Sequence, residues 1–433
     1  MIKSFPISLA LTLFFATALV LGLCLKFWLT SRQIRHVALH RTTVPPVFAS
    51  TISLAAHQKA ADYTIAKSRL SLLGAALGSF ILLGWTLLGG LHALNQAVLA
   101  WQAPGLIAQL SLLLGFIFVG AVIDLPLTLY QTFILEERFG FNKITFKLWF
   151  LDAVKSAVVG ALVGLPIAAL TLWVMGATGT LWWLWVWVIW MGFNLSLLMI
   201  YPSFIAPLFN KFKPLEDETL KARVTALMER CGFSAKGLFV MDGSRRSAHA
   251  NAYFTGFGAA KRVVFYDTLL AKLSPDEVDA VLAHELGHFK HKHIIQRIVM
   301  MFVISFLGLA LLGFLSNQIW FFTGLGVQPN MAGGNDALTL ILFMLAVPVF
   351  TFFLSPLSAQ LSRKQEFQAD AYAIAQTSGQ HLAAALLKLY EDNASTLTPD
   401  PLFVKFYYSH PPATERLPRM TATLLTVHAG ATL

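Results

Sequence analysis

The chain has 433 residues, of which 56% are apolar and only 12% are charged. Soluble domains carry about 25% charged residues, so this composition excludes an ordinary soluble multidomain enzyme, and it excludes an intrinsically disordered chain as well. In a membrane protein the net charge of +10 bears on the orientation of the spans and does not require a nucleic-acid partner. The two cysteines are too few for a disulfide framework or a cysteine-built zinc site.

Seven apolar runs reach the length of about 20 residues that a helix needs to cross a bilayer. They lie at about residues 7–29, 70–91, 105–130, 153–175, 180–201, 294–316 and 336–357. We therefore predict a mainly α fold, a polytopic membrane protein with seven transmembrane helices. For the first run the alternative is a cleaved signal peptide, because Lys3 precedes it and small residues lie within it.

The Lys and Arg residues are confined to alternate connections between these runs. Thirty-one of the 32 lie in or beside the loops at 30–69, 131–152 and 202–293, or in the tail after residue 357. The loops near 92–104, 176–179 and 317–335 contain none. Because such residues accumulate on the cytoplasmic side of membrane spans, we predict an N-terminus outside the membrane and a cytoplasmic C-terminus.

Two polar pieces remain between and after the spans. We divide the chain into 1–201 with five spans, 202–293 as the first polar piece, 294–357 with spans six and seven, and 358–433 as the second polar piece. Each polar piece is too short to be a large domain by itself. We expect the two to pack together as one cytoplasmic α+β domain.

The first polar piece contains an H-E-x-x-H motif, formed by His284, Glu285 and His288. Residues four apart lie on one face of a helix, so both imidazoles can reach one zinc ion while Glu285 borders the water that the ion holds. The alternative is a group of surface histidines, to which His291 and His293 would also belong.

The start of the motif's helix is marked by Ser274, Pro275 and Glu277. Ser at the N-cap and Glu three residues later predict a capping box, and proline suits the first helical position. The spacing of apolar residues continues from there into His284.

A catalytic zinc takes three protein ligands and keeps one position for water. The best third ligand is Glu366, in a segment at 362–370 that begins a few residues past the seventh span. Asp370 lies four residues later on the same helix face, where it can accept a ring N–H from a ligating histidine and fix its tautomer. A solvated helix face is the alternative for this pair of carboxylates.

A short strand is predicted at 251–257, followed by a second strand at 262–266. As the edge of a sheet, the first strand can bind an extended peptide by strand addition, so Asn251, Ala252 and Tyr253 are candidate substrate-binding residues. The alternative is a hairpin that only supports the core.

In the tail, His410 and Arg416 stand on either side of a rigid Pro-Pro pair and a short polar segment. His410 can stabilise an oxyanion, and Arg416 can pair with Glu366 or Asp370. Taken alone, a histidine in this position is more often structural.

Together these segments resemble the type 1 CAAX prenyl proteases, integral-membrane zinc metalloproteases of the gluzincin kind. The resemblance covers nearly the whole chain after the first span, through segments 135–143, 201–210, 251–257, 284–293, 363–370 and 410–416. It implies seven spans, one zinc ion per chain and a large water-filled chamber with the active site at its cytoplasmic end.

The resemblance also implies roles for single residues. Zinc would be held by His284, His288 and Glu366, with Glu285 as general base and acid. By the same resemblance, Asp370 would contact a ligating histidine without touching the metal, His410 would stabilise the oxyanion, and Asn251 would contact the substrate.

We therefore predict a zinc metalloendopeptidase that cuts peptide bonds near the C-terminus of prenylated or other membrane-associated substrates. The alternatives are a quality-control protease without prenyl specificity, a catalytically inactive scaffold, and a metal-ion transporter or sensor. The last residues, 428–433, carry no dilysine-type retrieval signal, which favours a bacterial inner membrane. The sequence gives no prediction of oligomeric state.

Overall fold

The structure is a computed structural model that describes residues 6–233, 237–255, 262–331 and 333–430, with side chains up to residue 421 and without that of Thr255. Seven helices within this part are long and apolar enough to cross a membrane, which confirms the predicted spans. They are α1 (Ile7–Leu39), α2 (Leu54–Trp85), α4 (Leu106–Tyr130), α5 (Phe146–Ala177), α6 (Trp182–Ile200), α11 (His293–Leu315) and α13 (Asp336–Thr351).

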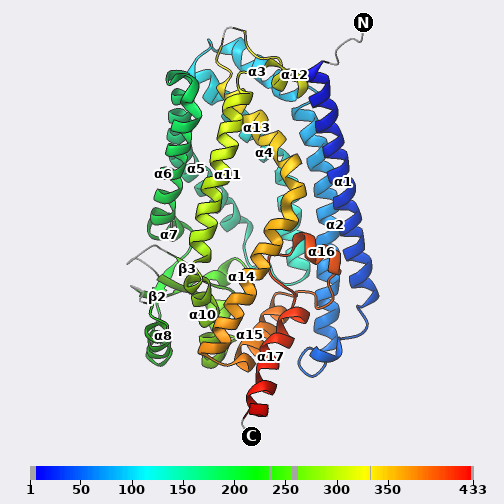
Figure 1. Cartoon of the computed structure of the whole chain (residues 1–433), viewed down its shortest axis with the longest axis vertical. Helices are drawn as coiled ribbons and strands as arrows, with labels where there is room; N and C mark the ends of the chain where they lie inside the picture. The colour runs from blue at the N-terminus through cyan, green and yellow to red at the C-terminus, as the bar shows by residue number, and fades with distance from the viewer. Residues whose placement is uncertain (1–5, 234–236, 256–261, 332, 431–433) are drawn as a thin grey trace.

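The long helices run along the long axis of the molecule and separate two different ends (Figure 1). Two short helices, α3 (Gly90–Trp101) and α12 (Ile319–Gly324), lie at one end. The other end holds the sheet and α7 (Ala206–Phe209), α8 (Glu218–Arg230), α9 (Asp267–Leu270), α10 (Pro275–Lys290), α14 (Ser355–Gln376), α15 (Gly379–Asp392), α16 (Pro401–Tyr407) and α17 (Ala413–Gly430).

The second span begins and ends earlier than its apolar run, 70–91, predicts. Helix α2 starts after Ser53, whose side chain accepts a hydrogen bond from the Ala56 N–H at 3.1 Å. It stops before Gly89, whose φ of +80° turns the chain into α3. A Cβ on Gly90 would lie 2.5 Å from the Gly84 carbonyl oxygen, so this tight turn requires glycine. Because the turn is itself apolar, hydropathy does not reveal it.

Helices α1 and α2 extend well beyond their apolar runs. At about 1.5 Å per residue, their 33 and 32 residues form rods of about 48 Å, whereas the hydrocarbon core of a bilayer is about 30 Å thick. The segment 30–69, which the hydropathy pattern presents as a loop, is therefore helical except for residues between the two helices. Lys67 consequently lies within α2.

The sheet has four strands in the order β1-β2-β4-β3. They are β1 (Phe212–Pro214), β2 (Gly237–Met241), β3 (Ala252–Thr255) and β4 (Arg262–Tyr266). The central pair β2–β4 is parallel, and the outer strands pair antiparallel to it. The two predicted strands are thus confirmed as neighbours, with β3 at an edge.

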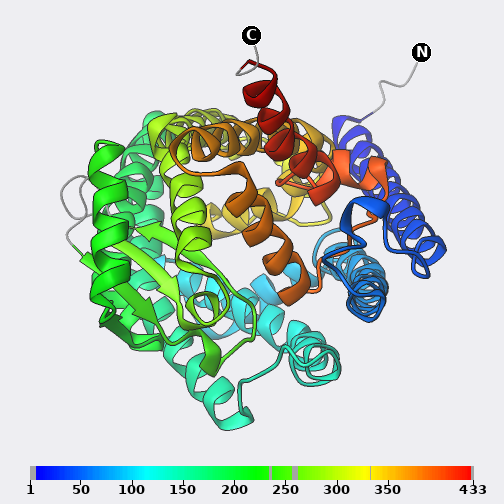
Figure 2. The ribbon, with the colours of Figure 1, turned by 90° about the horizontal axis from the view of Figure 1, so that it is seen from below.

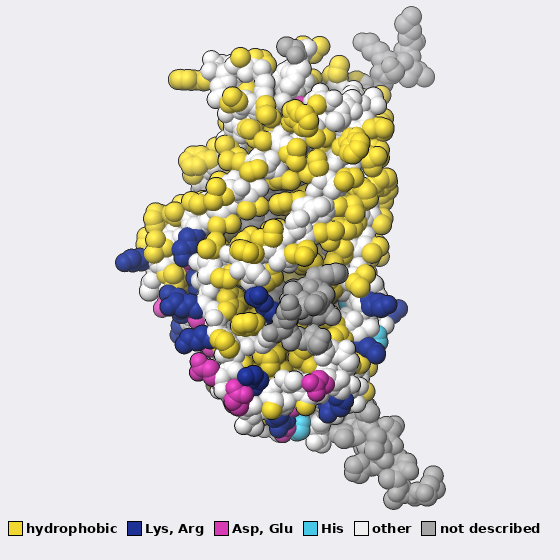
Figure 3. Space-filling view, turned by 90° about the vertical axis from the view of Figure 1, so that its left-hand side faces the viewer, with side chains coloured by type: hydrophobic (Ala, Val, Ile, Leu, Met, Phe, Trp, Pro, Cys, Tyr) yellow, Lys and Arg dark blue, Asp and Glu magenta, His cyan; other side chains and the backbone are white. Residues whose placement is uncertain are grey.

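Both polar pieces contribute to one hydrophobic core at the sheet end. Val224, Phe265, Leu282, Leu386 and Met420 are among its buried members. Seen from below, α15 (orange) lies between the sheet (green) and helices α1 and α2 (blue) (Figure 2). The face drawn in Figure 3 is largely apolar over the spans, and its charged side chains gather at the sheet end.

Candidate metal centre

Helix α10 presents the H-E-x-x-H motif and begins as predicted. The Ser274 side chain accepts a hydrogen bond from the Glu277 N–H, and the Glu277 carboxylate accepts one from the Ser274 N–H at 2.7 Å, which completes the capping box. The helix ends at Lys290, and a tight turn with Lys292 at φ +56° leads directly into the span α11. The motif therefore lies immediately beside a membrane helix.

Helix α14 continues from the seventh span through one turn of 3-10 helix and packs along α10. Gly287, inside the motif, makes this close approach possible. A Cβ at this position would lie 2.9 Å from the Ala369 Cα and 3.1 Å from the Ala369 carbonyl oxygen. The sequence around Gly287 does not predict this role, because the need for glycine arises only from the neighbouring helix.

The packing of α10 against α14 brings the three predicted ligands together. His284 Nε2 lies 3.4 Å from Glu366 Oε2, and His288 Nε2 lies 3.4 Å from Glu366 Oε1. Suitable donor atoms of all three residues lie within 4.8 Å of one another. Ligand atoms about 2.1 Å from a tetrahedral ion are separated by about 3.4 Å, so the observed spacing suits such an ion.

Glu366 Oε2 provides an independent test of whether a metal fits. The atom is buried and has no hydrogen-bond partner among the described residues, since its contact with His284 lacks hydrogen-bond geometry. An unpartnered carboxylate oxygen is costly to bury unless a cation compensates it. Two imidazoles and one carboxylate are the donor set of many catalytic metal ions, so these residues fit a divalent metal.

Asp370 and Arg416 hold His284 from behind. His284 Nδ1 lies 2.9 Å from Asp370 Oδ1, which leaves Nε2 directed at Glu366. Arg416 Nε and Nη2 donate to the two oxygens of Asp370 at 2.8 and 2.5 Å. Of the two partners considered for Arg416, the structure thus selects Asp370. Burial lowers the pKa of His284, but its contacts with Asp370 and Glu366 outweigh burial and raise the pKa to about 9.

His288 is oriented by a second relay that the sequence analysis missed. Its Nδ1 lies 3.0 Å from Nδ1 of the buried His293, and His293 Nε2 lies 3.0 Å from Gln368 Oε1. Because an amide oxygen only accepts, His293 carries its proton on Nε2, and its Nδ1 then accepts from His288. His288 Nε2 is thereby left with a free lone pair for a metal. His293 is therefore more than an additional surface histidine.

Glu285 and His410 lie at the open side of the ligand group. Glu285 follows His284 on α10, is partly exposed, and makes no side-chain hydrogen bond or ion pair within the described residues. His410 Nε2 lies 3.4 Å from Glu366 Oε1, and 66% of its side chain is exposed. Ser409 Oγ lies 2.9 Å from His410 Nδ1 and steadies the ring.

The edge strand β3 approaches α10 with one face. Phe254 packs against the ring of Phe289 at a centroid distance of 5.1 Å, and Phe289 is the residue after His288. Asn251, just before the strand, is exposed, and its side-chain oxygen accepts a hydrogen bond from the Ala252 N–H at 2.8 Å. Residues 256 and 257 of the predicted strand lie outside the described residues.

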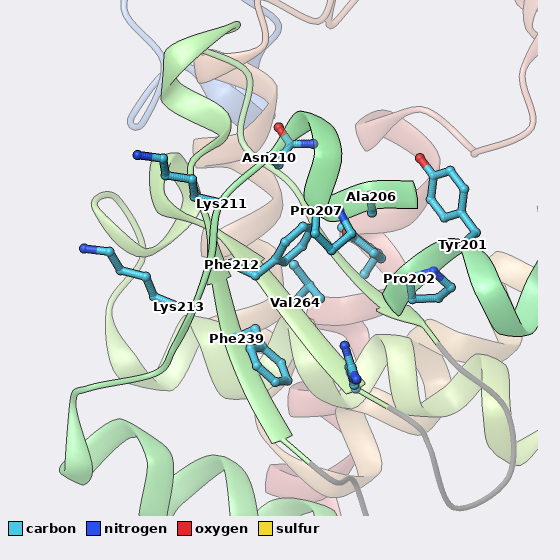
Figure 4. A pocket seen from close by; sticks show the side chains of 12 residues that line it. Tyr201, Pro202, Ala206, Pro207, Asn210, Lys211, Phe212, Lys213, Phe239 and Val264 are labelled. Atoms are coloured by element: carbon cyan, nitrogen blue, oxygen red, sulfur yellow. The ribbon is translucent and has the colours of Figure 1, made fainter. Parts of the chain in front are cut away.

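The Tyr253 side chain lies on the opposite face of the sheet from Phe254. It lines a cavity of about 460 Å³ between the sheet and the segment 201–211, which contains α7. Figure 4 shows Phe212, Phe239 and Val264 of this cavity with Pro207 and Tyr201 above them. Tyr253 can therefore contribute main-chain groups beside α10, whereas its ring faces a separate cavity.

Two family models match the chain in succession. Residues 33–211 match the CAAX prenyl protease N-terminal region of five membrane helices, and residues 214–424 match peptidase family M48. CAAX prenyl protease 1 of Saccharomyces cerevisiae is 34% identical over 414 residues, which cover 90% of each chain. The Arabidopsis thaliana homologue is 35% identical over 90% of this chain and 92% of its own. The crystal structure of S. mikatae Ste24p superposes with a TM-score of 0.88 at 32% identity, covering 96% of this chain and all of the other.

Proposed function

Because the chain belongs to peptidase family M48, in the form that carries the CAAX prenyl protease N-terminal region, we propose that this multi-pass membrane metalloendopeptidase uses zinc to cut prenylated CAAX-type or other membrane-associated substrates near their C-terminus. The observation that carries the proposal is the convergence of His284, His288 and Glu366 at the spacing of a tetrahedral site. Membership in a peptidase family sets aside the transporter alternative.

The catalytic steps would be carried out by the metal with its three ligands, by Glu285 and by His410. Zinc held by His284, His288 and Glu366 would act as a Lewis acid and lower the pKa of a water towards about 7. Glu285, which has no side-chain hydrogen bond or ion pair among the described residues, removes a proton from the attacking water and passes it to the leaving amine. His410, on the exposed side of Glu366, donates to the carbonyl oxygen as negative charge develops there.

The surrounding residues position these groups. Asp370 and His293 fix the tautomers of the two ligating histidines, and Arg416 fixes Asp370. Strand β3 is an edge strand, so a substrate peptide can extend the sheet beside α10, with Asn251 at the start of that edge.

We further propose that the metal centre and the C-terminus lie in the cytoplasm, with the N-terminus outside, in a bacterial inner membrane. The distribution of Lys and Arg supports this orientation, since all but one lie on the side of the polar pieces. A membrane-anchored substrate would then present its end directly to the site.

The test is cleavage of paired prenylated and unprenylated peptides with a C-a-a-X end by the purified full chain. We expect hydrolysis to stop with a zinc chelator, to return with added zinc, and to be faster for the prenylated peptide. Chelator-insensitive cleavage would overturn the zinc assignment. Equal rates for both peptides would leave a peptidase without prenyl specificity.

A further inference from the structure

Two cavities share Lys67 in their lining, and among the described residues none of the three proposed metal ligands lines either of them. The first, of about 420 Å³, lies between α2, the end of α15 and the segment that leads to His410. The second, of about 600 Å³, lies between α1, α2, α4 and α16. Lys67, Phe403 and Tyr407 line both cavities, so Lys67 stands where one passes into the other.

The charge in these cavities is of one sign. Lys67 lines both and Lys26 lines the second, while no Asp or Glu of the described residues lines either of them. Concave surfaces lined by one sign of charge concentrate counter-ions of the opposite sign. The pair of cavities is therefore suited to a ligand that carries a negative group.

Lys67 has no acidic partner of its own among the described residues. Its Nζ lies 4.9 Å from the centre of the Tyr63 ring, a cation–π contact that leaves its N–H groups able to donate. The carboxylate of Glu136 accepts hydrogen bonds from Tyr63 Oη at 2.8 and 2.9 Å. Within the described residues it forms no ion pair with Lys67. The ammonium group is thus available to an anion that enters the cavity.

The first cavity connects this cation to the catalytic site. His410 lines the cavity, and its Nε2 lies 3.4 Å from Glu366. A peptide held at the metal with its following residues in this cavity directs its C-terminus along α2. Three extended residues span roughly 10 Å, and both His410 and Lys67 line this one cavity.

We propose that Lys67 binds the free C-terminal carboxylate of the substrate. This deepens the proposed function: the substrate class becomes peptides that end in a carboxylate a few residues after the cut bond. An ammonium–carboxylate contact is a charge-assisted hydrogen bond, stronger than a neutral one. It makes Lys67 a residue that determines specificity, separate from the metal ligands.

The experiment compares kcat/KM for a peptide acid with that for the same peptide as its C-terminal amide. For the unaltered protein we expect a preference of about 10- to 100-fold for the acid, mainly through KM, as for one hydrogen bond to a charged group. In Lys67→Met the ratio of kcat/KM for the acid to that for the amide falls towards one. In Lys67→Arg most of the preference for the acid is restored.

Lys59→Met is the matched control. Lys59 lies on the same helix, and its Nζ lies over the Phe141 ring at the same distance of 4.9 Å, but it lines neither cavity. We expect this variant to keep both the activity and the acid preference.

Three outcomes would overturn the proposal. They are equal cleavage of acid and amide by the unaltered protein, a parallel fall for both peptides in Lys67→Met with the ratio intact, and the same loss of ratio in Lys59→Met. In each case chelator-sensitive cleavage would still support the peptidase function. Failure to cleave either peptide in the presence of zinc would instead contradict the proposed function itself.

Discussion

In the spanning helices, large apolar side chains such as Phe118, Leu162 and Leu307 are more than half exposed, whereas at the candidate metal centre Glu366 and Asp370 are buried beside histidine and arginine side chains. Exchange of one exposed apolar side chain for another leaves a helix able to span, because length and hydropathy alone are required. At the candidate metal centre, by contrast, Asp370 contacts both His284 and Arg416, and Glu366 lies 3.4 Å from both ligating histidines. The two regions should therefore differ sharply in their response to substitution.

The largest effect is expected for Glu285→Gln. Loss of a general base typically lowers the rate by about 100- to 10,000-fold, while the three metal ligands remain. We expect zinc content near one per chain, measured by elemental analysis, with peptide hydrolysis almost abolished. Near-full hydrolysis by this variant would remove Glu285 from the mechanism.

Gln368→Leu should show that the metal site depends on residues that do not touch the metal. Without the amide acceptor, His293 no longer has to carry its proton on Nε2, and His288 loses its fixed tautomer. We expect zinc affinity to fall about 10- to 100-fold, measured by competition with a chelator, with activity recovering in excess zinc.

Gln360→Leu is the control for that variant. Gln360 lies on the same helix and donates to the Lys405 carbonyl oxygen at 3.1 Å, away from the ligands. Its substitution should leave zinc affinity unchanged. An equal fall in both variants would mean that α14 had been disturbed as a whole.

A pair of Gly→Ala substitutions compares the two regions directly. In Gly287→Ala the new methyl group meets the backbone of Ala369 at 2.9 Å, so α10 and α14 must separate, at a cost of about 1–3 kcal/mol and with weakened zinc binding. In Gly192→Ala, on the span α6, no atom of the described residues lies within 4 Å of the new group, and thermal stability should stay equal or rise. The measurement is the unfolding temperature of each variant in detergent, with and without zinc. Equal changes in both variants would contradict the expected difference between the metal centre and the spans.

The smallest effect is expected at Asp400, which links α1 to α16. Its carboxylate caps α16 by accepting from the Leu402 and Phe403 N–H groups at 3.0 Å, and Arg32 Nη2 donates to it at 3.0 Å. Burial raises the pKa of Asp400, but these hydrogen bonds and Arg32 outweigh burial and lower it below 3.8. A carboxyl group whose pKa is lower in the folded state than in the unfolded state stabilises the fold at pH values above its unfolded-state pKa. This stabilisation disappears as the pH falls through the folded-state pKa.

Asp400→Asn should therefore lower the unfolding temperature by a few degrees at pH 7 and by progressively less as the pH falls below about 4. The measurement is thermal unfolding of both proteins between pH 7 and pH 3. A difference that stays constant over this range would assign the effect to the cap alone.

Local patterns made much of the molecule predictable. Hydropathy identified all seven spans, and the capping box and four-residue spacings located α10 and the pair Glu366 and Asp370. The residues that were missed depend on contacts between distant segments. Gly287 is required by Ala369, and His293 acquires its role from Gln368, neither of which leaves a mark in the nearby sequence. The second span was misplaced because its terminal turn is as apolar as its helix.

The direct continuation of both ligand helices from membrane spans has a mechanical consequence. His284 and His288 stand one tight turn from α11, while Glu366 stands on the extension of α13. When bilayer thickness changes, spans tilt or shift to match it, and α11 and α13 need not tilt equally. The donor atoms of the candidate metal site are thus attached to two separate membrane spans, and we expect a change in hydrophobic thickness to alter the distances between these atoms.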